Sequence, residues 1–387
     1  MLALFFQSVR LHFRWWWSSL CPGRHQSAPL GVRRLLFLLV GYPAFLLLQG
    51  VHWLGFACDA LCFPGYRKVK ITAPVFVLGI PRSGTTFLHR TLAEDRKQFT
   101  SFTSWEAVLA PSITERKILG ALRVLDRLLG SPLSKITEKL LRSAAGDFQS
   151  VHEVGPRAAE EDYLSLLPAG ACFILLLAFP FAAELRLLGQ LEELPDEKRE
   201  RILNFYRKAL QRHLYCHPGK RLLSKNAAFS SWAGALREIF PDGKFLACVR
   251  EPTSALSSQL SALSAARSLF ATDPDGHHTA HLFSRIYAHS FRVLAEFVDL
   301  APPSQVAVIE QSDMRAEPAG TIRSALDQLG LACPGLTDNL NPGHTSAHRH
   351  HPADFPVDPG SIKDCMKPAY EAMLRSSNRS TVSRSRA

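Results

Sequence analysis

The chain has 387 residues, of which 47% are hydrophobic and 20% are charged, so it can form one large α/β domain with appended segments. Its formal net charge of +11 comes from the two ends: residues 1–70 carry eight Lys and Arg side chains against Asp59 alone, and four arginines follow Glu371. The acidic and basic residues of 71–374 balance. A neutral central region argues against a nucleic-acid groove, and basic flanks are typical of contact with a membrane surface.

The amino-terminal sequence predicts a segment that associates with a membrane. The first twenty residues mix aromatic side chains with Arg10 and Arg14, which is typical of an interfacial amphipathic helix. Leu35 to Cys58 then run for 24 residues without an acidic or basic side chain. A helix of that length covers about 36 Å, enough to span a bilayer. Pro43 and Gln49 interrupt the run, so a kinked or interfacial helix is the alternative.

Residues 74–86, PVFVLGIPRSGTT, predict a buried strand that leads into a phosphate-binding loop. Val75 to Leu78 are a short apolar run of the kind found inside a parallel sheet. A glycine turn at a helix N-terminus presents backbone N–H groups and the positive end of the helix dipole to an anion. The residues that we predict to bind the anion are Arg82, Ser83, Gly84, Thr85 and Thr86.

The glycine spacing in this loop imitates the nucleotide P-loop. Thr85, however, stands where that motif requires a lysine to reach the β- and γ-phosphates. An ATP-dependent kinase is an alternative function, and the absence of this lysine argues against it.

PRSGTT after an apolar strand resembles the 5′-phosphosulfate loop of sulfotransferases that use 3′-phosphoadenosine-5′-phosphosulfate (PAPS), in their bacterial-type and tyrosylprotein-like branch. In that family an arginine at the end of a later strand, and a serine eight positions on, hold the 3′-phosphate. FLACVREPTSALSS has this pattern, with a predicted strand over 245–249 followed by Arg250 and Ser258. Ligands of open α/β sheets bind at the carboxyl ends of strands, which agrees with this placement. The resemblance implies a P-loop-like three-layer α/β fold, with a central parallel sheet flanked by helices.

The resemblance also implies two catalytic side chains besides Arg82. In tyrosylprotein and heparan-type sulfotransferases a glutamate soon after the loop is the general base that takes the proton of the attacking hydroxyl, and Glu106 in FTSWEAVLAPS matches it. A family lysine at the end of the strand before the second site matches Lys225 in LLSKNAAF. Its ammonium would neutralise charge on the bridging oxygen as the sulfuryl group leaves. The acidic run Glu160-Glu161-Asp162 is the other candidate for the base.

We therefore predict PAPS-dependent transfer of a sulfuryl group to a hydroxyl of a lipid, glycan or small metabolite at a membrane. PAPS is the predicted co-substrate, and no metal is expected, because Arg82, Lys225 and backbone N–H groups supply the positive field. The residues after Lys225 depart from the family pattern, so an inactive nucleotide-binding membrane scaffold is an alternative of a different class. A Golgi-type lumenal enzyme and a bacterial enzyme on the cytoplasmic face both remain open.

Three regions are predicted along the chain. Residues 1–66 form the membrane-associating segment and residues 67–340 the sulfotransferase core. Residues 341–387 form a lid-like loop, a short helix and a disordered basic tail.

Overall fold

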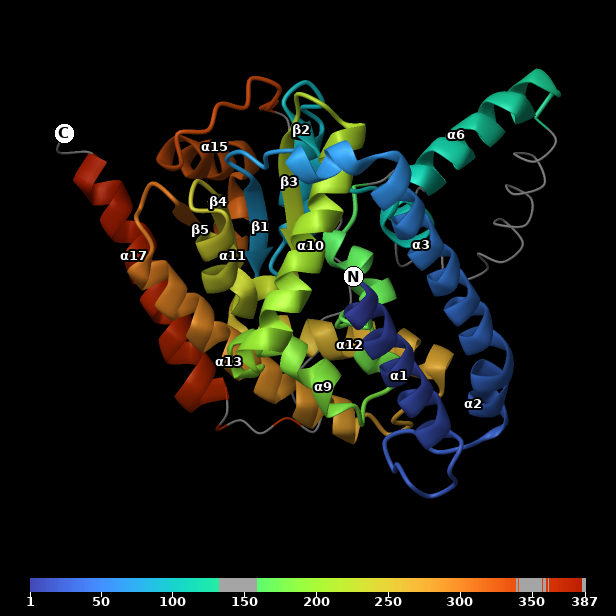
Figure 1. The fold of residues 1–387 in the computed structure, drawn as a ribbon. Helices are drawn as coiled ribbons and strands as arrows, with labels where there is room; N and C mark the ends of the chain where they lie inside the picture. The colour runs from blue at the N-terminus through green and yellow to red at the C-terminus, as the bar shows by residue number, and fades with distance from the viewer. Residues whose placement is uncertain (132–158, 339, 341–356, 358–359, 361, 385–387) are drawn as a thin grey trace.

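A parallel β-sheet forms the centre of the protein, in a computed structural model that describes residues 1–131, 159–338, 340, 357, 360 and 362–384. The sheet has five strands in the order β2-β3-β1-β4-β5. Helices lie on both of its faces (Figure 1), which confirms the predicted three-layer α/β fold. The strands are β1 (Val75–Gly79), β2 (Phe99–Thr100), β3 (Arg221–Asn226), β4 (Lys244–Val249) and β5 (Val306–Glu310).

Strand β1 shows why the strands of this sheet have continuous apolar sequences. Phe76 and Leu78 pack into the hydrophobic core on one face of the sheet, and Val75 and Val77 pack into the core on the other face. Side chains alternate along a strand, so a strand covered on both sides needs apolar residues at every position. The predicted strand over Val75 to Leu78 is present.

The strand order puts β1 in the middle, with β3 on one side and β4 on the other. The chain therefore leaves β1 toward β2 and β3 first and crosses later to β4 and β5. This is a topological switch point, and such points hold ligands at the carboxyl edge of open α/β sheets.

The helices of the central region connect the strands of the sheet. The predicted helix after the phosphate loop is α4 (Thr85–Ala93), and α10 spans Asp196–Cys216. The other helices are α5 (Ser104–Val108), α6 (Ile113–Leu128), α8 (Leu175–Ala178), α9 (Ala183–Arg186), α11 (Ala233–Ile239), α12 (Pro252–Phe270), α13 (His277–Leu300), α14 (Gln311–Ala316) and α15 (Pro318–Gln328). The 3₁₀ turns are η2 (Pro64–Lys68), η4 (Asp162–Ala169), η5 (Leu187–Gly189), η6 (Leu191–Glu193) and η7 (Ala227–Trp232).

The amino-terminal region forms two antiparallel helical arms that pack on the core. The first is α1 (Leu2–Ser19). The second is a continuous helix from Val32 to Cys62, long and apolar enough to cross a membrane by length and composition, and it comprises α2 (Val32–Leu36), η1 (Phe37–Gly41) and α3 (Tyr42–Cys62). The η1 turn is π-helical and ends two residues before Pro43, which has no N–H to continue regular α-helical bonding to the preceding turn. We call Val32–Cys62 the long helix.

The carboxyl-terminal region differs from the prediction. Most of the predicted lid-like loop lies outside the described residues. It is followed by η9 (Ile362–Met366) and α17 (Lys367–Arg384), so the predicted short helix extends through most of the predicted disordered tail. Buried Tyr370 and Met373 pack this helix into the main core, which gives it tertiary support that composition alone does not reveal.

Candidate active site

The loop between β1 and α4 turns at residues with positive φ. Gly79 has φ 143°, and a Cβ there would come within 2.0 Å of the Cys248 carbonyl oxygen, so only glycine fits where β1 meets β4. Gly84 has φ 89° and forms the N-cap of α4. Arg82, with φ 70°, is a non-glycine residue in the left-handed region, which costs roughly 1–2 kcal/mol. Its contacts must hold it there.

Arg82 joins the two predicted phosphate sites. Its Nε donates to Ser258 Oγ at 3.1 Å, and its carbonyl oxygen accepts a hydrogen bond from Arg250 Nη1, also at 3.1 Å. Gln311 Nε2 donates to the same carbonyl at 3.1 Å. Residues far apart in the sequence are thus brought together at the carboxyl edge of the sheet.

The charges around this junction favour a multiply charged anion. Burial lowers the pKa of the Arg250 guanidinium, and the positive charges of Arg315 and Arg82 lower it further. In the described part of the chain none of these three guanidinium groups forms an ion pair with a carboxylate. Clustered like charges repel one another, so binding of a phosphate or sulfate group would stabilise the cluster.

The remaining loop residues have different surroundings. Ser83 is fully buried, and both its hydroxyl and its N–H donate to the Ile80 carbonyl, at 2.6 and 3.2 Å. Its side chain therefore holds the shape of the loop. Thr85 is buried and Thr86 is exposed at the first turn of α4. The N–H groups of a first turn have no partner within the helix, so this end of α4 is suited to an anion.

Lys225 lies at the end of β3, with its side chain only 6% exposed. Its ammonium donates to Glu161 Oε1 in an ion pair. Its charge also reaches α4, because burial and then the Lys225 charge lower the pKa of His89 to about 3. Lys225 is thus close both to the helix that follows the phosphate loop and to the predicted acidic run.

The three carboxylates of that run have separate partners. Glu160 Oε2 accepts a hydrogen bond from Ser104 Oγ at 3.3 Å, while Glu161 pairs with Lys225. Asp162 Oδ2 accepts one from Tyr206 Oη at 2.7 Å. Burial raises the pKa of Asp162 to about 7, against the lowering effect of hydrogen bonds from Ser224 and Tyr206. Of the three carboxylates, only that of Glu161 contacts the predicted catalytic lysine.

Glu106 belongs to a different polar network. Its Oε2 accepts hydrogen bonds from the N–H and the hydroxyl of Thr103, at 3.0 and 2.7 Å, in a capping box that begins α5. Its Oε1 lies 3.0 Å from His217 Nε2 and 3.3 Å from Arg116 Nη1. Burial would raise the pKa of Glu106, but the His217 hydrogen bond and the Arg116 charge outweigh it and hold the pKa far below its usual range. Among the described residues, none of its hydrogen bonds or ion pairs reaches Lys225 or Arg82.

Glu106, His213 and His217 also form a group with ligand atoms close enough for a metal, within 4.8 Å of one another. Arg116 Nη1 lies 3.2 Å from His213 Nδ1 and 3.3 Å from Glu106 Oε1. The permanent positive charge of Arg116 therefore lies beside two of the three ligand groups, where it would repel a metal cation. The group is better described as a hydrogen-bonded network than as a metal centre.

Three residues of the junction are absent from the sequence-based prediction. Gln311 and Arg315 follow β5 directly, so the rule that ligand groups gather at carboxyl ends of strands would have pointed to them. Tyr287 Oη donates to the Pro81 carbonyl at 3.2 Å. It lies within α13, where no local sequence pattern distinguishes it from a core aromatic residue.

The glycine turn before α4, the cluster of three arginines and the ion pair of Lys225 with Glu161 thus lie toward the carboxyl edge of the sheet. The chain belongs to the sulfotransferase family, which it matches over residues 74–335. The predicted family is thereby confirmed.

Two mycobacterial relatives, each described as an omega-hydroxy-beta-dihydromenaquinone-9 sulfotransferase Stf3, are 26% identical over 267 residues. They come from Mycobacterium bovis and Mycobacterium tuberculosis, and the match covers 67% of this chain and 63% of their length.

Two crystal structures share the fold. STF1 from Mycobacterium tuberculosis H37Rv has a TM-score of 0.66 at 16% identity, over 95% of this chain and 98% of its own. STF9 from Mycobacterium avium has a TM-score of 0.69 at 14% identity, over 97% and 95%.

Proposed function

We propose that this sulfotransferase uses PAPS as its donor and transfers the sulfuryl group to a hydroxyl at a membrane. The observation that supports the donor best is the junction of Arg82, Ser258 and Arg250. PAPS carries phosphate groups on both its 5′ and 3′ positions, and it therefore needs two anion sites side by side. In this proposal Arg82 and the N-terminus of α4 bind the 5′-phosphosulfate, and Arg250 and Ser258 bind the 3′-phosphate.

The proposed reaction is an in-line displacement. The acceptor oxygen attacks sulfur, the bond from sulfur to the bridging oxygen breaks, and 3′-phosphoadenosine-5′-phosphate (PAP) leaves. The Lys225 ammonium offsets the charge that develops on the bridging oxygen. A carboxylate takes the acceptor proton. As in phosphoryl transfer, positioning and neutralisation of charge contribute most of the rate.

For the base we propose Glu161 in preference to Glu106. Glu161 contacts Lys225 and its side chain is 20% exposed, so an acceptor hydroxyl can approach it. The Glu106 side chain is 5% exposed, and both of its oxygens already accept hydrogen bonds within the α5 capping network. A base must come within hydrogen-bond distance of the proton that it removes, so accessibility decides between them.

A lipid-type hydroxyl is the acceptor class that we favour over a glycan or a small metabolite. The Stf3 relatives are named for a hydroxylated dihydromenaquinone, which is a membrane lipid. The exposed apolar side of the long helix supports the same class, because it would bring the enzyme to where such acceptors are.

The test of this proposal compares PAP, ATP and AMP as ligands by calorimetry and thermal shift, and then assays transfer from ³⁵S-labelled PAPS to a lipid extract. We expect PAP to bind most tightly and label to enter the lipid fraction. Tighter binding of ATP would indicate a kinase. Strong PAP binding with no PAP release in the presence of any acceptor fraction would indicate an inactive nucleotide-binding scaffold.

A further inference from the structure

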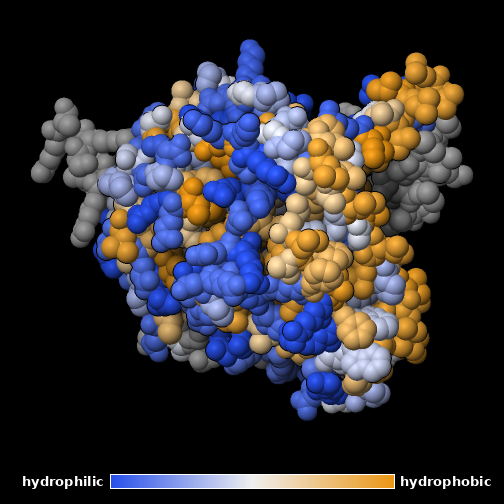
Figure 2. Space-filling view, viewed as in Figure 1, coloured by the Kyte–Doolittle hydropathy of each residue, from blue (hydrophilic) through white to orange (hydrophobic). Residues whose placement is uncertain are grey.

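One side of the protein presents a continuous apolar face, formed by the outer sides of α1, the long helix and α6. Figure 2 shows hydrophobic side chains gathered along this side, over the elements labelled α2, α3 and α6 in Figure 1. On α1 the exposed stripe has helical spacing: Leu2, Phe6, Val9, Phe13 and Trp17. We call these outer sides the apolar face.

The long helix exposes apolar side chains and buries polar ones, which is the reverse of a surface helix in a water-soluble protein. Every exposed residue from Leu35 to Cys62 is apolar, with Leu47 73% and Leu54 67% exposed. Apart from Arg33 at its start, its charged side chains and those of Gln49 and His52 point inward: Arg34, Gln49, His52 and Asp59 are all buried. A helix at a water interface has the opposite arrangement.

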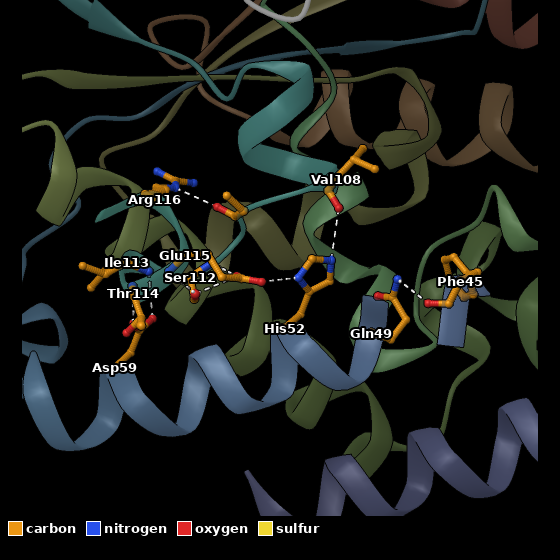
Figure 3. A network of polar contacts seen from close by, with 11 residues as sticks. Phe45, Gln49, His52, Asp59, Val108, Ser112, Ile113, Thr114, Glu115 and Arg116 are labelled. Carbon is orange, nitrogen blue, oxygen red and sulfur yellow. Dashed lines mark hydrogen bonds and ion pairs between the residues drawn. The ribbon is translucent and has the colours of Figure 1, made fainter. Parts of the chain in front are cut away.

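The buried polar side chains fix the long helix to the catalytic domain at several points. Asp59 accepts hydrogen bonds from the N–H of Ile113, at 3.0 Å, and from Arg212 Nε, at 2.9 Å. His52 Nδ1 lies 2.6 Å from Glu115 Oε1 (Figure 3). Near the other end, Arg34 Nη1 donates to the Phe270 carbonyl at 3.1 Å.

These contacts conflict with a separate membrane span. A helix fixed at both ends to the catalytic domain cannot cross a bilayer unless the domain enters the bilayer with it. Freeing the helix would leave the Asp59 charge without its partner Arg212 and the Arg34 charge without its hydrogen bonds, and such charges are very unfavourable in hydrocarbon.

The charges beside the apolar face identify its occupant. Exposed Arg10, Arg14 and Arg33 lie on the two arms, and α6 carries exposed Lys117, Arg123 and Arg127. Within α1, the long helix and α6, all of which the structure describes, every acidic residue is buried. A second copy packed on the same face would oppose arginine to arginine, whereas anionic lipid head groups complement this charge.

We infer that the protein is monotopic: it lies on the bilayer with α1, the long helix and the outer side of α6 embedded in one leaflet, parallel to the membrane plane. The inference rests on the proposed membrane location but not on the proposed sulfuryl transfer. It replaces the spanning helix that length and composition predict.

One short 3₁₀ segment, η4, connects the embedded arms to Glu161, the proposed base that pairs with Lys225. Turn η4 starts directly after Glu161 and extends for eight residues, about 16 Å at 3₁₀ geometry. Near its end the Pro168 carbonyl accepts hydrogen bonds from Ser8 Oγ on α1, at 2.7 Å, and from Trp53 Nε1 on the long helix, at 2.9 Å. A hydroxyl of an amphiphile held in the same leaflet therefore has a short path to Glu161.

Vesicle binding tests the apolar face. The full chain is mixed with vesicles of phosphatidylcholine and phosphatidylglycerol, and its partition coefficient is measured by flotation. We expect Leu47→Glu/Leu54→Glu to lower the coefficient on the order of 100-fold or more, because each change places a charge in the leaflet. Leu300→Glu, equally exposed at the end of α13, is the matched control and should bind as the parent does. PAP binding and the thermal midpoint should stay unchanged in all variants.

Sidedness separates the in-plane arrangement from a span. A single accessible cysteine replaces Arg24, in the turn between the arms, or Arg67, after the long helix. In the background the six cysteines that are not buried, Cys21, Cys58, Cys62, Cys216, Cys333 and Cys365, are replaced by serine. With the protein bound to sealed vesicles, an impermeant maleimide added outside should label both positions equally. Protection of one position and labelling of the other would establish a span and overturn the inference.

Two other outcomes would also contradict it. Absence of vesicle binding by the parent chain would remove the membrane location itself, while leaving PAPS chemistry untouched. A parent dimer that Leu47→Glu/Leu54→Glu converts to a monomer, with vesicle binding unchanged, would show that the apolar face binds a second copy.

Discussion

Glu161 and Glu106 show how the surroundings of one residue type decide its role. Glu161 is partly exposed and pairs with Lys225, so under the proposed mechanism loss of its charge would affect the reacting groups directly. Glu106 is buried, caps α5 through Thr103, and pairs with Arg116 and His217. Removal of its charge would leave the Arg116 guanidinium buried without its partner.

The first prediction follows from this contrast. Glu161→Gln should reduce turnover on the order of 10²–10⁴-fold while leaving PAP affinity unchanged, because it removes a proton acceptor and keeps the shape. Glu106→Gln should instead lower the free energy of unfolding by about 1–3 kcal/mol, as expected when a buried hydrogen bond to a charged group is lost. Steady-state kinetics and urea unfolding on both variants provide the measurement. A stable Glu106→Gln protein without turnover, beside an active Glu161→Gln protein, would assign the base to Glu106.

A second residue-scale prediction concerns Arg250. Arg250→Ala should weaken PAP binding by about 10- to 100-fold, since a charge-assisted hydrogen bond contributes roughly 1.5–3 kcal/mol. AMP lacks the 3′-phosphate and should bind almost as before. Arg292→Ala, which removes an exposed arginine on α13, is the control for a general change in charge. Equal losses for PAP and AMP in isothermal titration would show that Arg250 does not bind the 3′-phosphate.

Among the elements, the phosphate loop depends on a glycine that no other residue can replace without movement of the sheet. In Gly79→Ala the new Cβ would meet the Cys248 carbonyl at 2.0 Å, and φ 143° is strained for any L side chain. We expect the thermal midpoint to fall by several degrees and PAP affinity to fall with it, because strain of this kind costs about 1–3 kcal/mol. Gly234→Ala, in helix α11 with no atom within 4 Å of the new Cβ, should be neutral. Equal stability of the two variants in a thermal melt would contradict this account of the loop.

The strands and the turns that follow them could be predicted from the sequence because local rules determine them. Continuous apolar runs, glycines that require positive φ, and an arginine at a strand end all act over a few neighbouring residues. The capping role of Glu106 also had a local signal, since Thr103-x-x-Glu106 is a capping-box pattern.

The orientation of the long helix could not be predicted in this way. Its uncharged run satisfies the length criterion for a bilayer span, and the sequence does not show which side faces the domain. Contacts such as those of His52 and Asp59 with α6 and α10 reveal that the polar side is buried. The partner of Lys225 was likewise undetermined, because Glu161 is 64 residues away in sequence.

At the scale of the whole molecule, the buried Asp162 links stability to pH. Its pKa is raised from 3.8 to about 7, chiefly by burial, so between these values the folded protein binds a proton that the unfolded chain does not. Stability should therefore decrease as pH rises from about 4 to about 7, by about 1.4 kcal/mol for each unit of raised pKa, and then level off.

The Asp162→Asn variant isolates this contribution. The free energy of unfolding of the variant minus that of the parent should be larger at pH 8 than at pH 5, as measured by urea unfolding. Asp196→Asn, at an exposed position at the start of α10, serves as the control. An Asp162→Asn advantage that does not change with pH would mean that Asp162 is already ionised in the folded protein at pH 5.

The central claim is that this fold transfers a sulfuryl group from PAPS with Lys225 at the bond that breaks. The most direct measurement follows PAP release and ³⁵S transfer from PAPS to a lipid extract, by the parent and by Lys225→Ala, with γ-labelled ATP in a parallel reaction. The account predicts label in the lipid fraction with equimolar PAP for the parent, a loss on the order of 10²-fold or more for Lys225→Ala, and no label from ATP. Label from ATP, or undiminished transfer by Lys225→Ala, would contradict it.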